Sequence, residues 1–222
     1  MSDTKGFAPT RKGGMKQLPP LPIDFDEEAH RYTWKPTGER LMMSVTGVLS
    51  ASKSKRTLQT FARTKSTWAP RGTYVHRCLE LFLKGEPAHT LMHGKYQEYV
   101  QPLLEYPLWE HFEPIALEYR VCDLKRNLGG SLDVLGYDHF CDRMVLLDLK
   151  TLGKGGRQYS TDAQLGGYLS MLIDHHKLVV DDCLTMWAGF GEAHLGASQP
   201  PDQCLVAWEN AYDIWKATQE EI

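Results

Sequence analysis

The chain has 222 residues, 42% of them hydrophobic and 24% charged, which suits one globular domain and excludes a disordered chain, a collagen-like repeat or a coiled-coil rod. The sequence shows no apolar run of the roughly 18 residues that a membrane helix needs, and no secretory signal. Residues 1–71 hold 13 Lys and Arg against 6 Asp and Glu, whereas residues 72–222 hold 12 against 22. This imbalance fits a protein that binds a polyanion through its basic part and a metal through its carboxylates. It fits equally well a basic N-terminal arm attached to an ordinary acidic domain.

The N-terminal half predicts an arm, a hairpin and a run of helices. Residues 1–22 are rich in Lys, Gly and Pro without an apolar period, which is typical of a flexible basic arm. Residues 23–34 and 40–45 flank a Lys-Pro-Thr-Gly turn and predict a β-hairpin. The apolar spacing then predicts helices at 45–51, 57–68, 72–84 and 94–106.

The second half predicts the sheet. Strands with short turns are expected at 115–122, 130–137 and 144–150, then a helix over 161–176, strands at 183–190 and 203–208, and a helix at 209–220. The strand at 144–150 is apolar on both faces, as a central strand is. This order predicts an α/β fold with a mixed central β-sheet flanked by helices. We expect one domain over 23–222, with the hairpin and helices in 23–112 and a core in 113–222.

Candidate chemistry begins at the end of the third strand, in Asp148-Leu149-Lys150. Side chains alternate along a strand, so Asp148 and Lys150 share a face, where a carboxylate can hold a hard cation and an amine can orient a water or offset an oxyanion. A hairpin with the preceding strand would bring Asp133 beside Asp148, and the repulsion between two close carboxylates favours a divalent cation between them. The alternative is a structural ion pair between Asp133 and Lys150.

Three further features belong to the candidate site, and each has a structural alternative. Gln164 and Tyr168 stand four residues apart on the following helix and share one helix face, which could equally face solvent. His76 is either a ligand or a surface residue paired with Glu80. Glu118 is either a site residue or an outward-facing strand residue.

Four motifs follow one another in the chain: Gly72 with His76, then Asp133, then Asp148-x-Lys150, then Gln164-x-x-x-Tyr168. Their order and spacing resemble the PD-(D/E)xK nuclease superfamily, and most of all its RecB-type exonuclease branch. That branch includes the mitochondrial genome maintenance exonuclease and many phage-encoded exonucleases. The resemblance covers residues 30–173, and it departs from the family pattern at Leu132, where the family name has proline.

The resemblance implies a restriction-endonuclease-like core that binds Mg²⁺ or Mn²⁺. The metal ligands that it implies are His76, Glu118, Asp133, Asp148 and the carbonyl of Leu149. Lys150 matches the catalytic lysine, and Gln164 and Tyr168 match the pair that shapes the site and contacts DNA. We expect no iron–sulfur cluster, because the cysteine cluster of the iron–sulfur members is absent, and no nucleotide cofactor, because the sequence lacks a Walker motif.

The expected activity is that of a metal-dependent deoxyribonuclease, an exonuclease on single-stranded DNA ends. A structure-specific endonuclease on the same fold and a non-catalytic DNA-binding subunit are the alternatives. The expected partner is DNA rather than a membrane, and the expected compartment is the cytoplasm of a bacterium or a phage-infected cell. Trp68 and Tyr74 are candidates for base stacking or for core packing. The basic residues expected to hold phosphates are Lys53, Lys55, Arg56, Arg63, Lys65, Arg71, Lys154 and Arg157.

Overall fold

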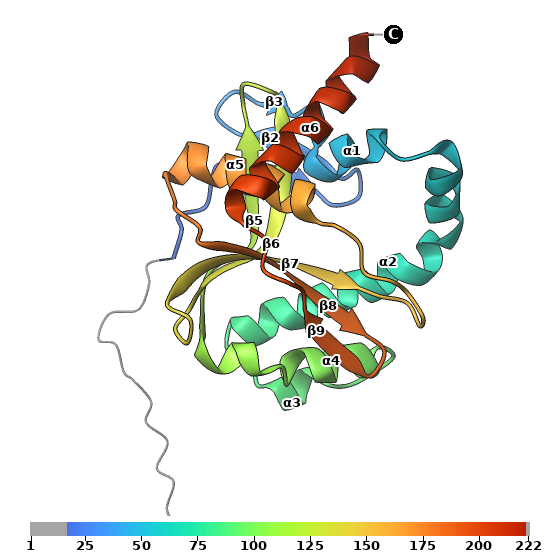
Figure 1. The fold of residues 1–222 in the computed structure, drawn as a ribbon, viewed down its shortest axis with the longest axis vertical. Coiled ribbons are helices and arrows are strands. Elements are labelled where there is room, and N and C mark those ends of the chain that lie inside the picture. The colour runs from blue at the N-terminus through green and yellow to red at the C-terminus, as the bar shows by residue number, and fades with distance from the viewer. Residues whose placement is uncertain (1–16, 221–222) are drawn as a thin grey trace, which may run out of the picture.

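The computed structural model describes residues 17–220 and has the mixed α/β architecture that the sequence predicts. The strands of the central sheet run in the order β4-β6-β7-β8-β9, and β5 also pairs with β6. Figure 1 shows α1, α5 and α6 on one side of this sheet and α2, α3 and α4 on the other. The strands are β4 (Met43–Ser44), β5 (Phe112–Asp123), β6 (Leu128–Asp138), β7 (Arg143–Thr151), β8 (Asp182–Gly189) and β9 (Glu192–Leu195).

The three predicted strands of the core are confirmed as the antiparallel meander β5-β6-β7. The helix α5 (Asp162–His176) then carries the chain to β8, which pairs in parallel with β7. Consecutive residues of β7 alternate between two apolar clusters, with Leu146 on the α5 side and Leu147 and Leu149 on the α2 side. Both faces of β7 are therefore covered, as its apolar sequence predicts.

The helices predicted at 57–68 and 72–84 form one helix, α2 (Lys55–Leu83), so the predicted break between them is wrong. Pro70 lies inside this helix. A proline removes one backbone hydrogen bond and bends a helix, and Figure 1 shows α2 changing direction along its length. The helix continues because Val75 and Leu79 bury its following turns against the sheet.

The remaining N-terminal helices lie close to their predicted positions. Helix α1 (Val45–Ala51) has the predicted bounds, and Ser44 caps it by accepting a hydrogen bond from the backbone of Gly47. The single helix predicted at 94–106 is shorter, α4 (Gln97–Leu104), and α3 (Ala88–Leu91) precedes it. A 3₁₀ turn at Pro107–His111 leads into β5.

The predicted hairpin is confirmed around its turn, within a separate three-stranded sheet, but its predicted bounds are wrong. The strand predicted over 23–34 is two strands with a turn between them, and the strand predicted over 40–45 divides because Met43–Ser44 pairs with β6 in the central sheet. β2 (Arg31–Trp34) and β3 (Glu39–Arg40) flank the predicted turn, and β1 (Ile23–Asp26) pairs with β2 on its other edge. The predicted arm lies outside the described residues up to residue 16. Its last part runs beside β5, where the backbone of Leu18 donates a hydrogen bond to the carbonyl of Ile115.

The strand predicted at 203–208 is wrong, because these residues belong to a long C-terminal helix, α6 (Pro201–Glu220). Cys204, Trp208 and Trp215 are the buried residues of this helix, and their spacing places them on one face. That face packs on α5 at Gly166, where a side chain would overlap the carbonyl oxygen of Cys204. Within the described part of the chain, no helix has the length and apolar character needed to cross a bilayer.

Candidate active site

The candidate site lies where β5 and β6 lose their regular alternation. In a regular strand, residues two apart share a face, yet Leu117 packs into the α2-side cluster and Tyr119 into the α5-side cluster. The same change of face occurs on β6 across Asp133. Glu118 has a φ of 45°, a left-handed conformation that is uncommon for a residue with a side chain. In both strands, therefore, the face to which alternate side chains point changes at an acidic residue: Glu118 in β5 and Asp133 in β6.

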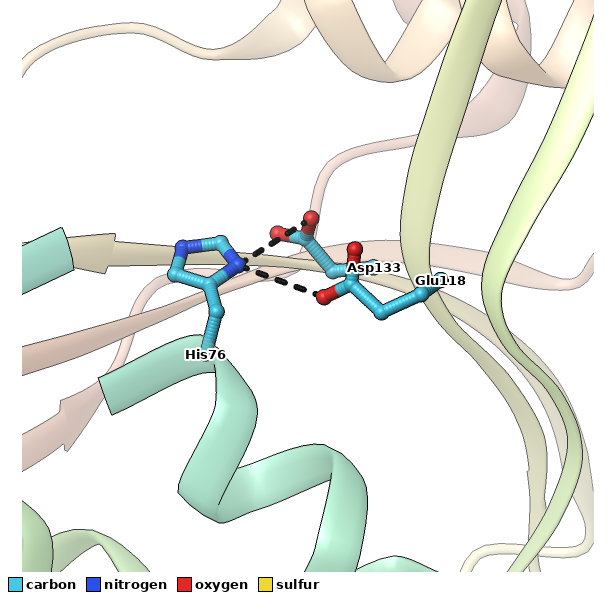
Figure 2. Close-up of side chains that lie close together, drawn as sticks. All are labelled: His76, Glu118 and Asp133. Carbon is cyan, nitrogen blue, oxygen red and sulfur yellow. Dashed lines mark ion pairs between the residues drawn. The ribbon is translucent and has the colours of Figure 1, made fainter. Parts of the chain in front are cut away.

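His76 on α2 meets these two acids. Its Nδ1 lies 3.5 Å from Oε1 of Glu118 and 3.4 Å from Oδ1 of Asp133, as Figure 2 shows. The three side chains come from α2, β5 and β6, and each offers one ligand atom within 4.8 Å of the other two. One imidazole and two carboxylates at this spacing form a donor set that a divalent cation can use.

The electrostatics of this group favour a charged imidazole when no cation is present. Burial lowers the pKa of His76, but the carboxylates of Asp133 and Glu118 outweigh burial and raise it to about 10. Burial raises the pKa of Glu118, and the charge of Asp133 adds to this effect. The pKa of Asp133 is lowered despite its burial, because the His76 charge and a backbone hydrogen bond stabilise the carboxylate. The proton on His76 thus occupies the place that a cation would take.

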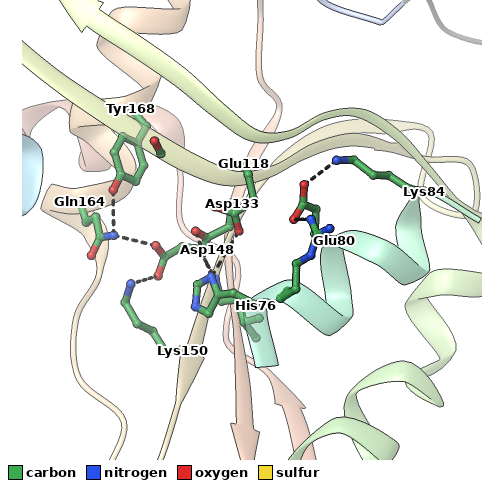
Figure 3. Close-up of polar contacts among 12 residues, drawn as sticks. His76, Glu80, Lys84, Glu118, Asp133, Asp148, Lys150, Gln164 and Tyr168 are labelled. Atoms are coloured by element: carbon green, nitrogen blue, oxygen red, sulfur yellow. Dashed lines mark hydrogen bonds and ion pairs between the residues drawn. The ribbon is translucent and has the colours of Figure 1, made fainter. Parts of the chain in front are cut away.

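Asp148 and Lys150 form the second part of the site. Nζ of Lys150 lies 2.6 Å from Oδ2 of Asp148, and Nε2 of Gln164 donates a hydrogen bond of 2.8 Å to Oδ1 of Asp148. The same Gln164 nitrogen lies 3.1 Å from the hydroxyl oxygen of Tyr168 (Figure 3). The two helical residues therefore point toward Asp148, and the expectation that they share one helix face is confirmed.

The two parts of the site are joined through the backbone of β7. The N–H of Leu149 donates a hydrogen bond of 2.6 Å to Oδ2 of Asp133. This bond holds the Asp133 carboxylate next to the Asp148-Leu149-Lys150 segment, as the predicted hairpin requires. The structure groups His76, Glu118 and Asp133 as one ligand set, whereas Asp148 faces Lys150 and Gln164.

The structural alternatives for these residues can now be compared with their contacts. Lys150 forms its ion pair with Asp148 rather than with Asp133. Glu80 is held by Arg77 and Lys84, so it is not the partner of His76. Gln164 and Tyr168 do not lie on a solvated face, since Tyr168 is buried and Gln164 bonds to Asp148. These contacts contradict three alternatives: an ion pair between Asp133 and Lys150, a pair between His76 and Glu80, and a solvent-facing Gln164 and Tyr168.

Burial sets the charge states of the Asp148–Lys150 pair. Burial raises the pKa of Asp148 to about 6, with Lys150 opposing the rise and Asp133 adding to it. The pKa of Lys150 is raised, because the Asp148 and Asp133 carboxylates outweigh burial. Oδ2 of Asp148 is fully buried and lies against the Lys150 ammonium, so a metal ion at Asp148 would compete with Lys150 for this oxygen. The group that fits a divalent metal is His76, Glu118 and Asp133, which offers one imidazole and two carboxylates.

A groove of about 1520 Å³ opens onto the site between the N-terminal sheet, α2 and β5. His76, Glu118 and Tyr168 lie in its wall. Trp68 lines this groove and is 41% exposed, which leaves its ring accessible. Tyr74 instead donates a hydrogen bond of 2.7 Å to the carbonyl of His93. Of the two aromatic residues proposed for stacking, Trp68 is the one placed at the groove.

The predicted phosphate-binding residues fall into three places. An exposed group lies on the segment before α2 and on its first half: Lys53, Lys55, Arg56, Arg63 and Lys65. The pKa of Lys53 is lowered, chiefly by burial and then by the charge of Lys150. Lys154 and Arg157 are exposed in the loop after β7. Arg71 differs from all of them because it is buried.

Tyr159 is a further candidate that sequence reasoning missed. Its side chain is 58% exposed, and the pKa of its hydroxyl is raised, chiefly by desolvation, with Lys150 and Asp148 as the charges that act on it. Its ring packs edge-on against Trp187, with centroids 5.1 Å apart. The available signal was its position in the loop that directly follows the Asp148-Leu149-Lys150 strand.

No family model matches the chain, and no curated protein is significantly similar to it. A functional proposal therefore depends on the residues of the site and on their geometry.

Proposed function

We propose that the chain is a metal-dependent deoxyribonuclease that hydrolyses phosphodiester bonds, acting as an exonuclease on single-stranded ends. The observation that carries the proposal is the joining of two groups by one hydrogen bond between Leu149 and Asp133. One group offers His76, Glu118 and Asp133 to a cation, and the other pairs a buried carboxylate with a lysine. The PD-(D/E)xK resemblance of the sequence supports the same activity.

Mg²⁺ or Mn²⁺ bound here would polarise a phosphate oxygen and lower the pKa of a water. The side chains supply orientation and charge. Lys150 stays protonated near neutral pH, because its pKa is raised, so it offers positive charge to the oxyanion that develops during cleavage. Gln164 fixes the Asp148 carboxylate, and the ion pair with Asp148 fixes Lys150. His76, which holds a proton between the two acids in the metal-free protein, would have to lose that proton to act as a ligand.

The groove favours a single strand as the substrate. The exposed ring of Trp68 lines the groove beside the site, and stacking on such a ring needs an unpaired base. The exposed basic residues that precede and begin α2 supply the charge that phosphates require.

The test is cleavage of linear and covalently closed circular single-stranded DNA of one sequence, with Mg²⁺, with Mn²⁺ and with EDTA. We expect loss of linear strands with either metal, survival of circles, and no reaction in EDTA. Asp148→Asn should abolish cleavage. Asp213→Asn, which changes an exposed acid on α6, is the matched control and should retain it.

Two other outcomes lead to the alternatives. Rapid cutting of circles identifies an endonuclease. Binding of single strands without cleavage in either metal identifies a non-catalytic DNA-binding subunit.

A further inference from the structure

Arg71 is a buried arginine just beyond the catalytic segment of β7. Its side chain is 9% exposed, and its Nε donates a hydrogen bond of 3.3 Å to Oγ1 of Thr151, the residue after Lys150. Its two terminal nitrogens face Gly153, where an added Cβ would lie 3.8 and 4.0 Å from them. The guanidinium is thus fixed between a strand end and a bare glycine backbone.

The side chains of Arg71 and Lys154 each lie over an aromatic ring rather than beside a carboxylate. The Arg71 guanidinium lies over the ring of Tyr99, 5.1 Å from its centroid. Tyr99 packs edge-on against Phe190, and Nζ of Lys154 lies 5.4 Å from the Phe190 centroid. A ring attracts a cation without cancelling its charge. The two cations therefore lie on neighbouring rings, whose centroids are 6.0 Å apart, and both keep their charge.

The contrast with Arg126 shows what is unusual here. Arg126 also lies over a ring, that of Tyr212, but its guanidinium forms a two-bonded ion pair with Glu209. Within residues 17–220, Arg71 has no such carboxylate partner. Burying a charge costs free energy unless an opposite charge lies beside it. The buried Arg71 guanidinium would therefore be stabilised by an anion from outside the chain.

We propose that Arg71, Lys154 and Thr151 form a phosphate-binding pocket next to the acid cluster. The planar guanidinium can donate two parallel hydrogen bonds to a phosphate, and Lys154 adds a point charge. Arg71 stands five residues before His76 on α2, about 7.5 Å along a helix axis. This role rests on the proposed nuclease function. The pocket would hold one phosphate of the DNA strand while a different phosphate of the same strand is cleaved.

The test is calorimetric titration of the metal-free protein with inorganic phosphate in EDTA, where no cleavage can occur. We expect binding by the wild type, at least about tenfold weaker binding by Arg71→Met, and wild-type binding by the matched control Arg126→Met. Arg71→Met should fold, because methionine can pack on Tyr99 and a buried unpaired charge is removed. Lys154→Met changes an exposed residue and should weaken phosphate binding less.

A second titration distinguishes the source of the phosphate. It compares oligonucleotides of one sequence with a 5′-phosphate, a 3′-phosphate or hydroxyl ends. If the pocket takes a terminal phosphate, one phosphorylated strand binds best and Arg71→Met removes its advantage. If it takes an internal phosphodiester, Arg71→Met weakens all three equally.

Phosphate affinity that is absent in the wild type, or equal in wild type and Arg71→Met, overturns the pocket. If phosphate binds through Arg71 but no metal supports cleavage, the pocket stands and the nuclease proposal fails.

Discussion

At the scale of single residues, the two aspartates of the site have opposite electrostatic environments. Ionised Asp148 is disfavoured by burial, whereas ionised Asp133 is favoured by His76 and by the Leu149 N–H. Sequence alone treats them as an equivalent pair, since both are lone acids in apolar strands. Their difference depends on which neighbour supplies a positive charge, and that is decided by the tertiary contacts of Lys150 and His76.

This difference predicts opposite effects on the stability of the metal-free protein near pH 8. Asp148→Asn should keep or raise the thermal unfolding midpoint, because it removes a disfavoured charge while an acceptor for Gln164 remains. Asp133→Asn should lower stability by about 3 kcal/mol, because His76 loses a buried partner. The pKa of Asp148 rises from 3.8 to about 6 on folding, so the wild type loses stability as pH rises across that window.

Thermal melts at several pH values check both expectations. The advantage of Asp148→Asn should disappear below pH 3.8, where wild-type Asp148 is protonated in both states. Equal destabilisation by the two variants at every pH would show that the aspartates are equivalent after all.

The raised pKa of His76 predicts that metal binding releases a proton. With a pKa of about 10, His76 is protonated at pH 7.5 and must lose that proton to ligate a cation. Calorimetric titration with Mn²⁺ in buffers of different ionisation enthalpy measures this release, and we expect close to one proton from the wild type.

His76→Gln is the matched variant and should release almost none. In the metal-free protein, the stabilising effect of charged His76 is full below pH 6.5 and is lost as pH rises through about 10. Proton release that is the same in His76→Gln would assign the proton to another group.

At the scale of helices and strands, local patterns predict some elements well and fail where packing decides. The strands β5, β6 and β7 were predictable because turn residues separate apolar runs. The single helix α2 was not, because Pro70 is a local break signal that the buried turns around Val75 and Leu79 override. The run from Cys204 to Trp208 is apolar enough for a strand, and only the close approach at Gly166 shows why it is helical.

Two of the helical glycines, Gly72 and Gly166, predict opposite responses to alanine. Gly72 on α2 has room for a Cβ, whose nearest neighbour would be Oγ1 of Thr151 at 3.9 Å. Gly72→Ala should therefore stabilise the protein by up to about 1 kcal/mol through helix propensity. Gly166→Ala should destabilise it by more than about 1 kcal/mol, because the added methyl overlaps the backbone of α6.

Urea unfolding of both variants measures these changes. Stabilisation by Gly166→Ala would mean that α5 and α6 do not pack as closely as the structure shows.

At the scale of the whole molecule, the site forms where the two layers of the fold meet. His76 comes from the helical layer that contains α2, and Gln164 comes from the layer that contains α5. In the sheet between these layers, the side chains of β5 and β6 change face at Glu118 and Asp133. The sequence could predict that His76, Asp133 and the Asp148-Leu149-Lys150 segment come together, because their types and order are visible in it. It could not predict the left-handed Glu118 or the burial of Arg71, since both arise from long-range packing.

The central claim is that the acid cluster and the Asp148–Lys150 pair act as one metal-dependent phosphodiesterase. The most direct test compares the wild type with Lys150→Met in saturating Mn²⁺, measuring cleavage of an end-labelled single-stranded oligonucleotide beside Mn²⁺ affinity. Since Lys150 contributes charge and no ligand atom to the cluster, we expect Lys150→Met to bind Mn²⁺ and to lose cleavage by about 100-fold or more. Wild-type cleavage by Lys150→Met, or no cleavage by the wild type in Mn²⁺ or Mg²⁺, would contradict the account.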